Sequence, residues 1–97
     1  MPTYVSLVSW TDQGVRDFRE STQRAEDFGK LVESSGGTVR ELLWTVGQYD
    51  MVSVVDFPDE ETGVAMLLQV SSLGNVRTDT LRAFGAEEMG AIIRRAG

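Results

Sequence analysis

The sequence contains no cysteine and no histidine among its 97 residues. Without cysteine there is no disulfide framework, no thiolate nucleophile and no cysteine-based metal site. Without histidine there is no imidazole base, no serine–histidine relay and no usual zinc ligand. Any catalysis would therefore depend on carboxylate, tyrosine, lysine, arginine, serine or threonine side chains, and we predict neither a metal nor a cofactor.

The sequence also lacks long apolar runs and a basic stripe. Its apolar runs are far shorter than a membrane span, and the segment from Met1 to Val5 shows no signal-peptide pattern. Fifteen acidic residues against nine basic ones give a net charge of −6, which repels phosphate backbones. We therefore expect a cytoplasmic protein that binds neither membranes nor nucleic acids.

The length and composition fit one globular domain spanning residues 1–97. The chain is 41% hydrophobic and 25% charged, which is ordinary for a folded protein. A chain of this size buries roughly two-thirds of its unfolded surface, so a modest core is expected.

Two periodicities predict a βαββαβ order followed by a terminal helix. Segments rich in β-branched and aromatic residues predict strands, and apolar residues spaced by three or four predict helices. The predicted strands are Thr3–Trp10, Thr38–Val46, Tyr49–Phe57 and Asn75–Phe84, and the predicted helices are Ser21–Ser35, one after Pro58, and Ala86–Ala96. This order indicates an α+β, ferredoxin-like, antiparallel four-stranded sheet with helices on one face, plus the C-terminal helix.

Local signals sharpen two of these elements. Gly47-Gln48 lies between two strand patterns, which predicts a two-residue type II′ hairpin turn. In the helix after Pro58, the acidic run Asp59-Glu60-Glu61 suits a helix start, and Val64, Leu67 and Leu68 are expected to form the buried face.

Three of the four predicted strands are apolar on both faces. In the first strand, Tyr4, Val8 and Trp10 are expected on one face and Val5 and Leu7 on the other. In the second strand, the two faces are Val39 and Leu43, and Leu42, Trp44 and Val46. In the third strand, they are Met51, Val55 and Phe57, and Val52 and Val54. A single layer of helices covers only one face, and a large uncovered apolar face usually has a partner. We expect a second copy of the chain, in a homodimer or higher assembly, to cover the other face. The alternative is that the terminal helix folds under the sheet.

Three segments are similar to those of the GYD family. They are the Gly-x-Tyr-Asp element at Gly47-Gln48-Tyr49-Asp50, the opening run YVSLVSWTDQG at residues 4–14, and the run SLGNVRT at residues 72–78. The resemblance extends over nearly the whole chain and implies a ferredoxin-like fold related to the dimeric α+β barrels. It implies no particular activity, since members of the wider group range from cofactor-free oxygenases to stress proteins.

Two charged residues are the candidates for catalysis. Asp50 could act as a general base with Tyr49 as donor, because a carboxylate buried without a cation has a raised pKa. The structural alternative is that Asp50 hydrogen-bonds backbone groups beside the Gly47 turn. Arg77 could clamp an anion or carbonyl group, or could simply be a charge on an edge strand.

Aromatic and hydroxyl side chains are the candidates for ligand binding. Tyr4, Trp10 and Tyr49 could line a pocket between the sheet and its cover, with Thr78 and Thr80 beside Arg77. Their alternative role is in the core or in an interface.

Three functional hypotheses follow from these residues. The first is a homo-oligomeric accessory or binding module that holds a small apolar or carbonyl-bearing ligand. The second is a cofactor-independent enzyme in which Asp50 is the base and Arg77 stabilises an oxyanion. The third is a purely structural or regulatory interaction protein. The enzyme requires Asp50 and Arg77 to face one cavity, whereas a binding module needs only the cavity.

Overall fold

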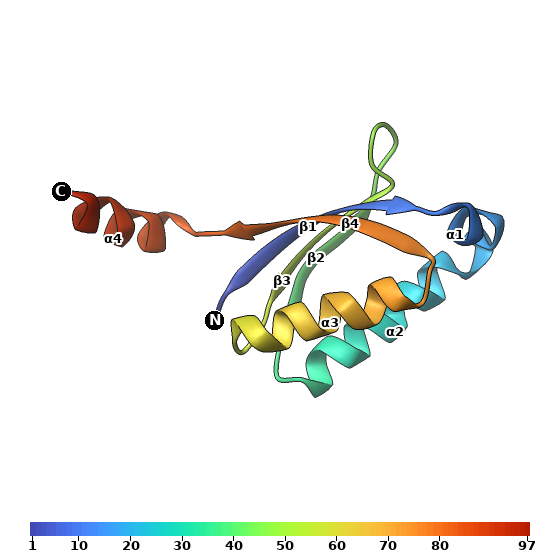
Figure 1. The fold of residues 1–97 in the computed structure, drawn as a ribbon, viewed down its shortest axis with the longest axis horizontal. Helices are drawn as coiled ribbons and strands as arrows, with labels where there is room; N and C mark the ends of the chain where they lie inside the picture. The colour runs from blue at the N-terminus through green and yellow to red at the C-terminus, as the bar shows by residue number, and fades with distance from the viewer.

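A computed structural model describes residues 1–97, and its elements follow the predicted order (Figure 1). The elements are β1 (Thr3–Trp10), α1 (Asp12–Arg16), a 3-10 turn (Phe18–Glu20), α2 (Ser21–Ser34), β2 (Thr38–Trp44), β3 (Met51–Asp56), α3 (Glu60–Ser72), β4 (Val76–Ala83) and α4 (Ala86–Ala96). The sheet is antiparallel with strand order β2-β3-β1-β4. This arrangement confirms the ferredoxin-like α+β fold and places β4 at an edge.

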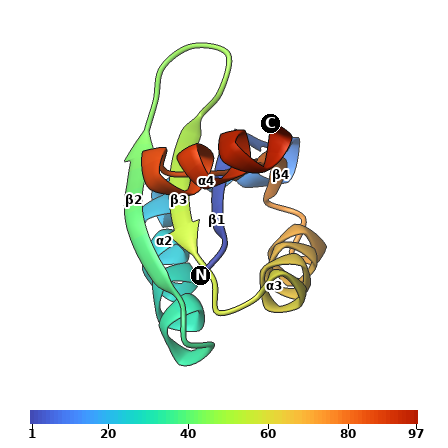
Figure 2. The same cartoon turned by 90° about the vertical axis from the view of Figure 1, so that its left-hand side faces the viewer.

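The two faces of the sheet have different surroundings. Helices α2 and α3 both cover one face, which we call the helix face, and the opposite side is the open face (Figures 1 and 2). Helix α2 lies on the side of β2, and α3 lies on the side of β4. The core lies under the helices, where Val32, Val55, Phe57 and Met66 pack together with Tyr4 at their border. Because side chains alternate along a strand, the residues between these core positions in β1 and β3 reach the open face, as predicted.

The predicted alternation in β2 is wrong at one end. The pairing between β2 and β3 shifts between Val39 and Glu41, so Arg40 is an extra residue in a β-bulge. Val39 packs against the core on the helix face, and Leu43 is exposed on the opposite face. A bulge inverts the alternation of the residues that follow it, and for this reason Val39 and Leu43 do not share a face.

The β2–β3 hairpin is longer than the predicted two-residue turn. β2 ends at Trp44 and β3 begins at Met51, and the loop is closed by the Thr45 amide, which donates to the Asp50 carbonyl at 2.9 Å. Gly47 does have a positive φ of 144°, in keeping with its predicted place in the turn. The strand pattern at Tyr49 therefore belongs to the loop.

Helix α3 approaches the sheet through glycine rather than through the predicted apolar residues. A Cβ on Gly63 would lie 2.9 Å from Cδ2 of Phe57 and 3.1 Å from Cε2 of Tyr4. Gly63 and Met66 are buried, whereas Val64 and Leu68 are exposed, so the predicted buried face is wrong for these two residues. The acidic start is confirmed, because Asp59 caps the helix by accepting from the Thr62 amide at 2.7 Å.

Helix α4 does not fold under the sheet. It continues outward beyond the end of β4 and stands away from the other helices (Figure 1). Its apolar side chains Met89, Ile92 and Ile93 are exposed, and Phe84 in the short link before it is exposed as well. The open face is therefore not covered by any helix of the same chain. No helix of the structure is long and apolar enough to cross a membrane.

Candidate functional site

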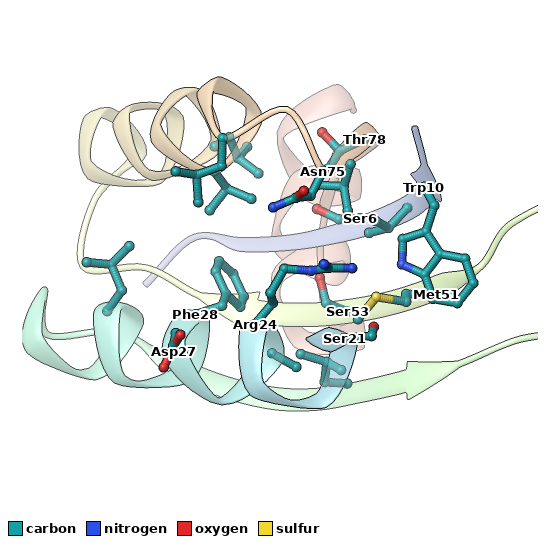
Figure 3. Close-up of a pocket in the computed structure, with 18 residues that line it drawn as sticks. Ser6, Trp10, Ser21, Arg24, Asp27, Phe28, Met51, Ser53, Asn75 and Thr78 are labelled. Atoms are coloured by element: carbon teal, nitrogen blue, oxygen red, sulfur yellow. The ribbon is translucent and has the colours of Figure 1, made fainter. Parts of the chain in front are cut away.

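A cavity of about 360 Å³ lies between the helix face and helices α2 and α3. Most of its wall is apolar and comes from both the strands and the two helices (Figure 3). The apolar lining includes Val8, Phe28, Leu31, Leu42, Met51, Leu67, Val70 and Leu73. Its volume falls at the lower end of the range typical of small-molecule sites.

The floor of the cavity is a polar row that crosses the middle of the sheet. Ser6 of β1 pairs in register with Ser53 of β3 on one side and with Thr80 of β4 on the other. Ser6 and Ser53 are only 5% and 6% exposed, and the Ser6 hydroxyl is hydrogen-bonded to the Thr80 hydroxyl at 2.9 Å. Since serine is small, these positions leave space that a large apolar side chain would fill, and the cavity lies over them.

The indole N–H of Trp10 is a buried donor without an acceptor. Its nitrogen is shielded from solvent and has no hydrogen-bond partner. By contrast, the Trp44 indole N–H donates to the Ser21 hydroxyl at 2.9 Å. In Figure 3 the nitrogen of Trp10 lies on the side of the ring that faces Arg24 and Ser53. Leaving a buried donor unpaired costs about 1–3 kcal/mol, so an acceptor at this point would be strongly favoured.

Arg24 brings a positive charge to the cavity wall. Its guanidinium donates to the backbone carbonyls of Gly14 and Asp17, each at 3.2 Å, and forms no ion pair within 4 Å. Asp27 also borders the cavity, but it is exposed and accepts from the Gln23 side chain at 3.0 Å. The half-buried charge on the cavity wall is therefore the positive charge of Arg24.

The end of the cavity beside Trp10 is closed by two loops that fit closely together. The Thr11 hydroxyl donates to the Gly74 carbonyl at 2.6 Å, and the Gln13 side chain donates to Asn75 Oδ1 at 3.0 Å. A Cβ on Gly14 would lie 1.9 Å from the Asn75 carbonyl oxygen, so only glycine permits this approach. Asn75 in turn lines the cavity.

Asp50 fixes the end of β1 rather than facing the cavity. Its carboxylate accepts from the Trp10 amide at 2.8 Å, and its own amide donates to the Val8 carbonyl at 2.8 Å. Asp50 thus holds the backbone that carries the indole. The three segments similar to the GYD family meet here, since residues 4–14, 47–50 and 72–78 surround the Trp10 end of the cavity.

The other predicted site residues are distributed over both faces of the sheet. Thr78 lines the cavity with Trp10. Thr80 does not line the cavity, but its hydroxyl is hydrogen-bonded to Ser6, which does. Tyr4 packs in the core against Phe57 with ring centroids 5.9 Å apart. Tyr49 lies in the hairpin loop, where its hydroxyl reaches Asp79 at 3.4 Å.

Arg77 lies on the face of β4 that points away from the cavity. It is exposed on β4 and pairs in register with Ser9, so it alternates away from Thr78 and the cavity. Neither Arg77 nor Asp50 lines the cavity. The structure therefore does not bring the two candidate catalytic residues together in one site.

Several polar residues of the cavity were not predicted as site residues from the sequence. Ser6 and Ser53 interrupt the helix-facing positions of otherwise apolar strands, and this interruption was a usable signal of a hollow in the core. Arg24 falls on the same helix as the apolar stripe that includes Phe28, but nothing in the sequence showed that it would lie beside Trp10.

Comparisons with known proteins agree with the resemblance in the sequence. The family model described as GYD domain matches residues 4–93. A protein of Thermus thermophilus named "Glutamine synthetase and cystathionine beta-lyase binding protein" is 30% identical over 90 residues, which cover 92% of this chain and 95% of that protein. No solved structure matches the chain. The chain belongs to the GYD domain family.

Proposed function

We propose that this protein is an accessory module that forms a homo-oligomer through its open face and, as an assembly, binds other proteins. The observation that carries the proposal is the uncovered apolar surface of the sheet. Its side chains lie in two adjacent rows that run across the strands. One row is Leu43, Val52 and Leu7, and the other is Val54, Val5 and Leu81. Leu43 and Leu81 are 55% and 50% exposed and the other four are half-buried. Covering this face removes further apolar surface from water at roughly 25 cal/mol per Å², which favours a partner.

Helix α4 supports the same proposal. It has 11 residues, Ala86–Ala96. Isolated helices shorter than about 12–15 residues are only marginally stable in water. It stands away from the rest of the chain with Ile92 and Ile93 exposed (Figure 1). A second copy, related by a two-fold axis, would supply each protomer with a cover for both its sheet and its helix.

The named relative indicates which partners to try first. The Thermus thermophilus protein is named for binding glutamine synthetase and cystathionine beta-lyase. We extend this to the present chain as a proposal that its partners are metabolic enzymes, with glutamine synthetase as the first candidate. An accessory role needs no catalytic pair, and Asp50 and Arg77 do not form one.

Self-association is tested with two matched leucine-to-lysine variants. Leu43 on the open face is 55% exposed, and Leu68 on the outer side of α3 is 68% exposed. We expect Leu43→Lys to shift the assembly towards monomers by at least about tenfold in dissociation constant, because a charge would be buried in the interface. Leu68→Lys should leave it unchanged. Sedimentation velocity and native mass spectrometry at micromolar concentrations measure both.

Two results would contradict this proposal. One is a wild-type protein that stays monomeric at tens of micromolar, and the other is an equal loss of assembly in both lysine variants. Binding to purified glutamine synthetase, measured by biolayer interferometry, then tests the partner: wild type and Leu68→Lys should bind alike.

A second function is favoured by the cavity. A hollow with an unpaired buried donor suits a module that also holds a small molecule, which the purely structural alternative does not need. We therefore include small-molecule binding in the proposed function. Ligand that co-purifies would appear in native mass spectra as excess mass that is lost on denaturation.

A further inference from the structure

We infer that the cavity is a binding site for a small carboxylic acid with an apolar tail, whose carboxylate pairs with the Trp10 indole N–H beside Arg24. This inference rests on the small-molecule component of the proposed function and adds the chemical class of the ligand. The argument depends on which polar groups face the cavity, on its apolar walls and on its charge.

Two polar groups at the Trp10 end are hydrogen-bond donors that a ligand could satisfy. The indole N–H has no partner, and the guanidinium of Arg24 is bound only to neutral carbonyl oxygens. Indole nitrogen and guanidinium donate and cannot accept. A ligand group that only donates would leave these hydrogens unpaired, whereas a carboxylate offers two acceptor oxygens.

The rest of the cavity is suited to hydrocarbon. Its apolar lining includes Phe28 and Leu31 from α2 and Leu67 and Val70 from α3. With a volume of about 360 Å³, the cavity is at the small end for ligand sites, so a short chain or a small ring fits better than a long lipid.

The charge of the site favours an anion over a cation in spite of the acidic chain. Arg24 is half-buried and has no carboxylate partner, while the acid on the same wall, Asp27, is exposed and hydrogen-bonded to Gln23. A charge-assisted pair in a half-buried position is roughly twice as strong as a neutral hydrogen bond. An ammonium group at the same point would instead meet the guanidinium as a like charge.

The contact requires a small movement of Trp10. Its nitrogen is shielded from solvent, so the ring must turn for the N–H to reach an oxygen in the cavity. The backbone can stay in place during this movement, because the Asp50 carboxylate holds the Trp10 amide at 2.8 Å. Ligand binding should therefore be visible at the indole N–H itself.

The test is a ¹H–¹⁵N NMR titration of the full chain with three six-carbon probes: hexanoate, hexanol and hexylamine. The chain has two tryptophans, so two indole N–H signals are expected, and the variants Trp10→Phe and Trp44→Phe assign them. We expect hexanoate to bind at least about tenfold more tightly than hexylamine and to move the Trp10 signal downfield. The Trp44 signal, already bonded to Ser21, should not move.

The two tryptophan variants form a matched pair. Each removes one indole N–H and keeps an aromatic ring, but only Trp10 lines the cavity. Trp10→Phe should weaken hexanoate binding by about five- to tenfold with little effect on hexanol, because it removes one donor to a charged acceptor. Trp44→Phe should leave both affinities unchanged.

The possible outcomes test separately whether the cavity binds ligands and whether those ligands are carboxylates. If none of the three probes shifts the amide signals of β1 and β3, the cavity is not a ligand site and the small-molecule component of the proposed function fails. If hexanol or hexylamine binds as tightly as hexanoate, or if Trp10→Phe and Trp44→Phe have equal effects, the site stands and the carboxylate assignment is overturned.

Discussion

The two faces of the sheet are both largely apolar, but each departs from the usual pattern of a folded domain in its own way. The helix face covers the core, but Ser6 and Ser53 interrupt it in the middle, beneath a cavity. The open face is uncovered, but Val5 and Val54 lie at its centre. An isolated domain usually has apolar residues throughout its covered face and polar residues on the uncovered one.

These two departures indicate that each face lacks a different kind of partner. A hollow lined by donors and hydrocarbon is completed by a small molecule, because only something small fits between α2, α3 and the strands. A flat apolar sheet surface of several side chains is completed by another sheet or helix, because only a macromolecule buries it at once. The following predictions probe this difference between the faces.

The largest effect is expected from emptying the core of the helix face. Phe57 is 1% exposed, and Phe57→Ala should lower the free energy of unfolding by about 3–5 kcal/mol at every protein concentration. Leu81→Ala on the open face should instead have an effect that grows with concentration, since it acts through assembly. Urea denaturation of each variant at two protein concentrations about 50-fold apart distinguishes the two effects, because such a difference shifts a dimer equilibrium. A loss of unfolding free energy in Phe57→Ala that depends on protein concentration would contradict this difference between the two faces.

A smaller effect is expected where α3 approaches the helix face. In Gly63→Ala the new Cβ would lie 2.9 Å from Phe57, and overpacking should cost about 1–3 kcal/mol of unfolding free energy. The control is Gly29→Ala in α2, where a Cβ meets no atom within 4 Å, and it should stabilise the protein by about 0.5–1 kcal/mol. Chemical denaturation measures both. Equal signs for the two variants would show that α3 has more freedom than the structure indicates.

The smallest effect is expected at the start of α3. The Asp59 carboxylate accepts from the Thr62 amide, and this hydrogen bond lowers the pKa of Asp59 below its ordinary value. A lowered pKa in the folded state contributes stability that is present above the unfolded pKa of about 3.9 and is lost as pH falls through the folded value. Asp59→Asn keeps the cap but cannot titrate there, so the difference in Tm between wild type and variant should shrink below about pH 4. A difference that is constant from neutral to acidic pH would exclude this linkage.

Much of the fold followed from local patterns in the sequence. The four strands and two of the helices were predicted close to their observed bounds, a third helix was predicted to follow Pro58, and Gly47 has the positive φ expected of a turn residue. The errors arose where one element depends on another. The Arg40 bulge inverts β2, and Gly63 rather than Val64 and Leu68 turns towards the sheet, because close packing of helix on strand decides which side of a helix is buried.

The candidate site was less predictable than the fold. Trp10 and Thr78 line the cavity, and Thr80 does not. Asp50 and Arg77 were paired only by their chemistry, and pairing of that kind requires knowledge of which way each side chain points. Ser53 and Arg24 entered the cavity from a strand and a helix that are distant from Trp10 in the sequence.

The element order, the lack of thiol and imidazole side chains and the surplus of apolar strand surface can be read from composition and pattern alone. Periodicity and composition are local properties, so they can be read without coordinates. The position of α4 away from the sheet, the meeting of three distant segments at Trp10 and the unpaired indole N–H are visible only in the folded chain. These facts depend on packing between elements far apart in the chain, where a shift of one residue or one ångström changes which atoms touch.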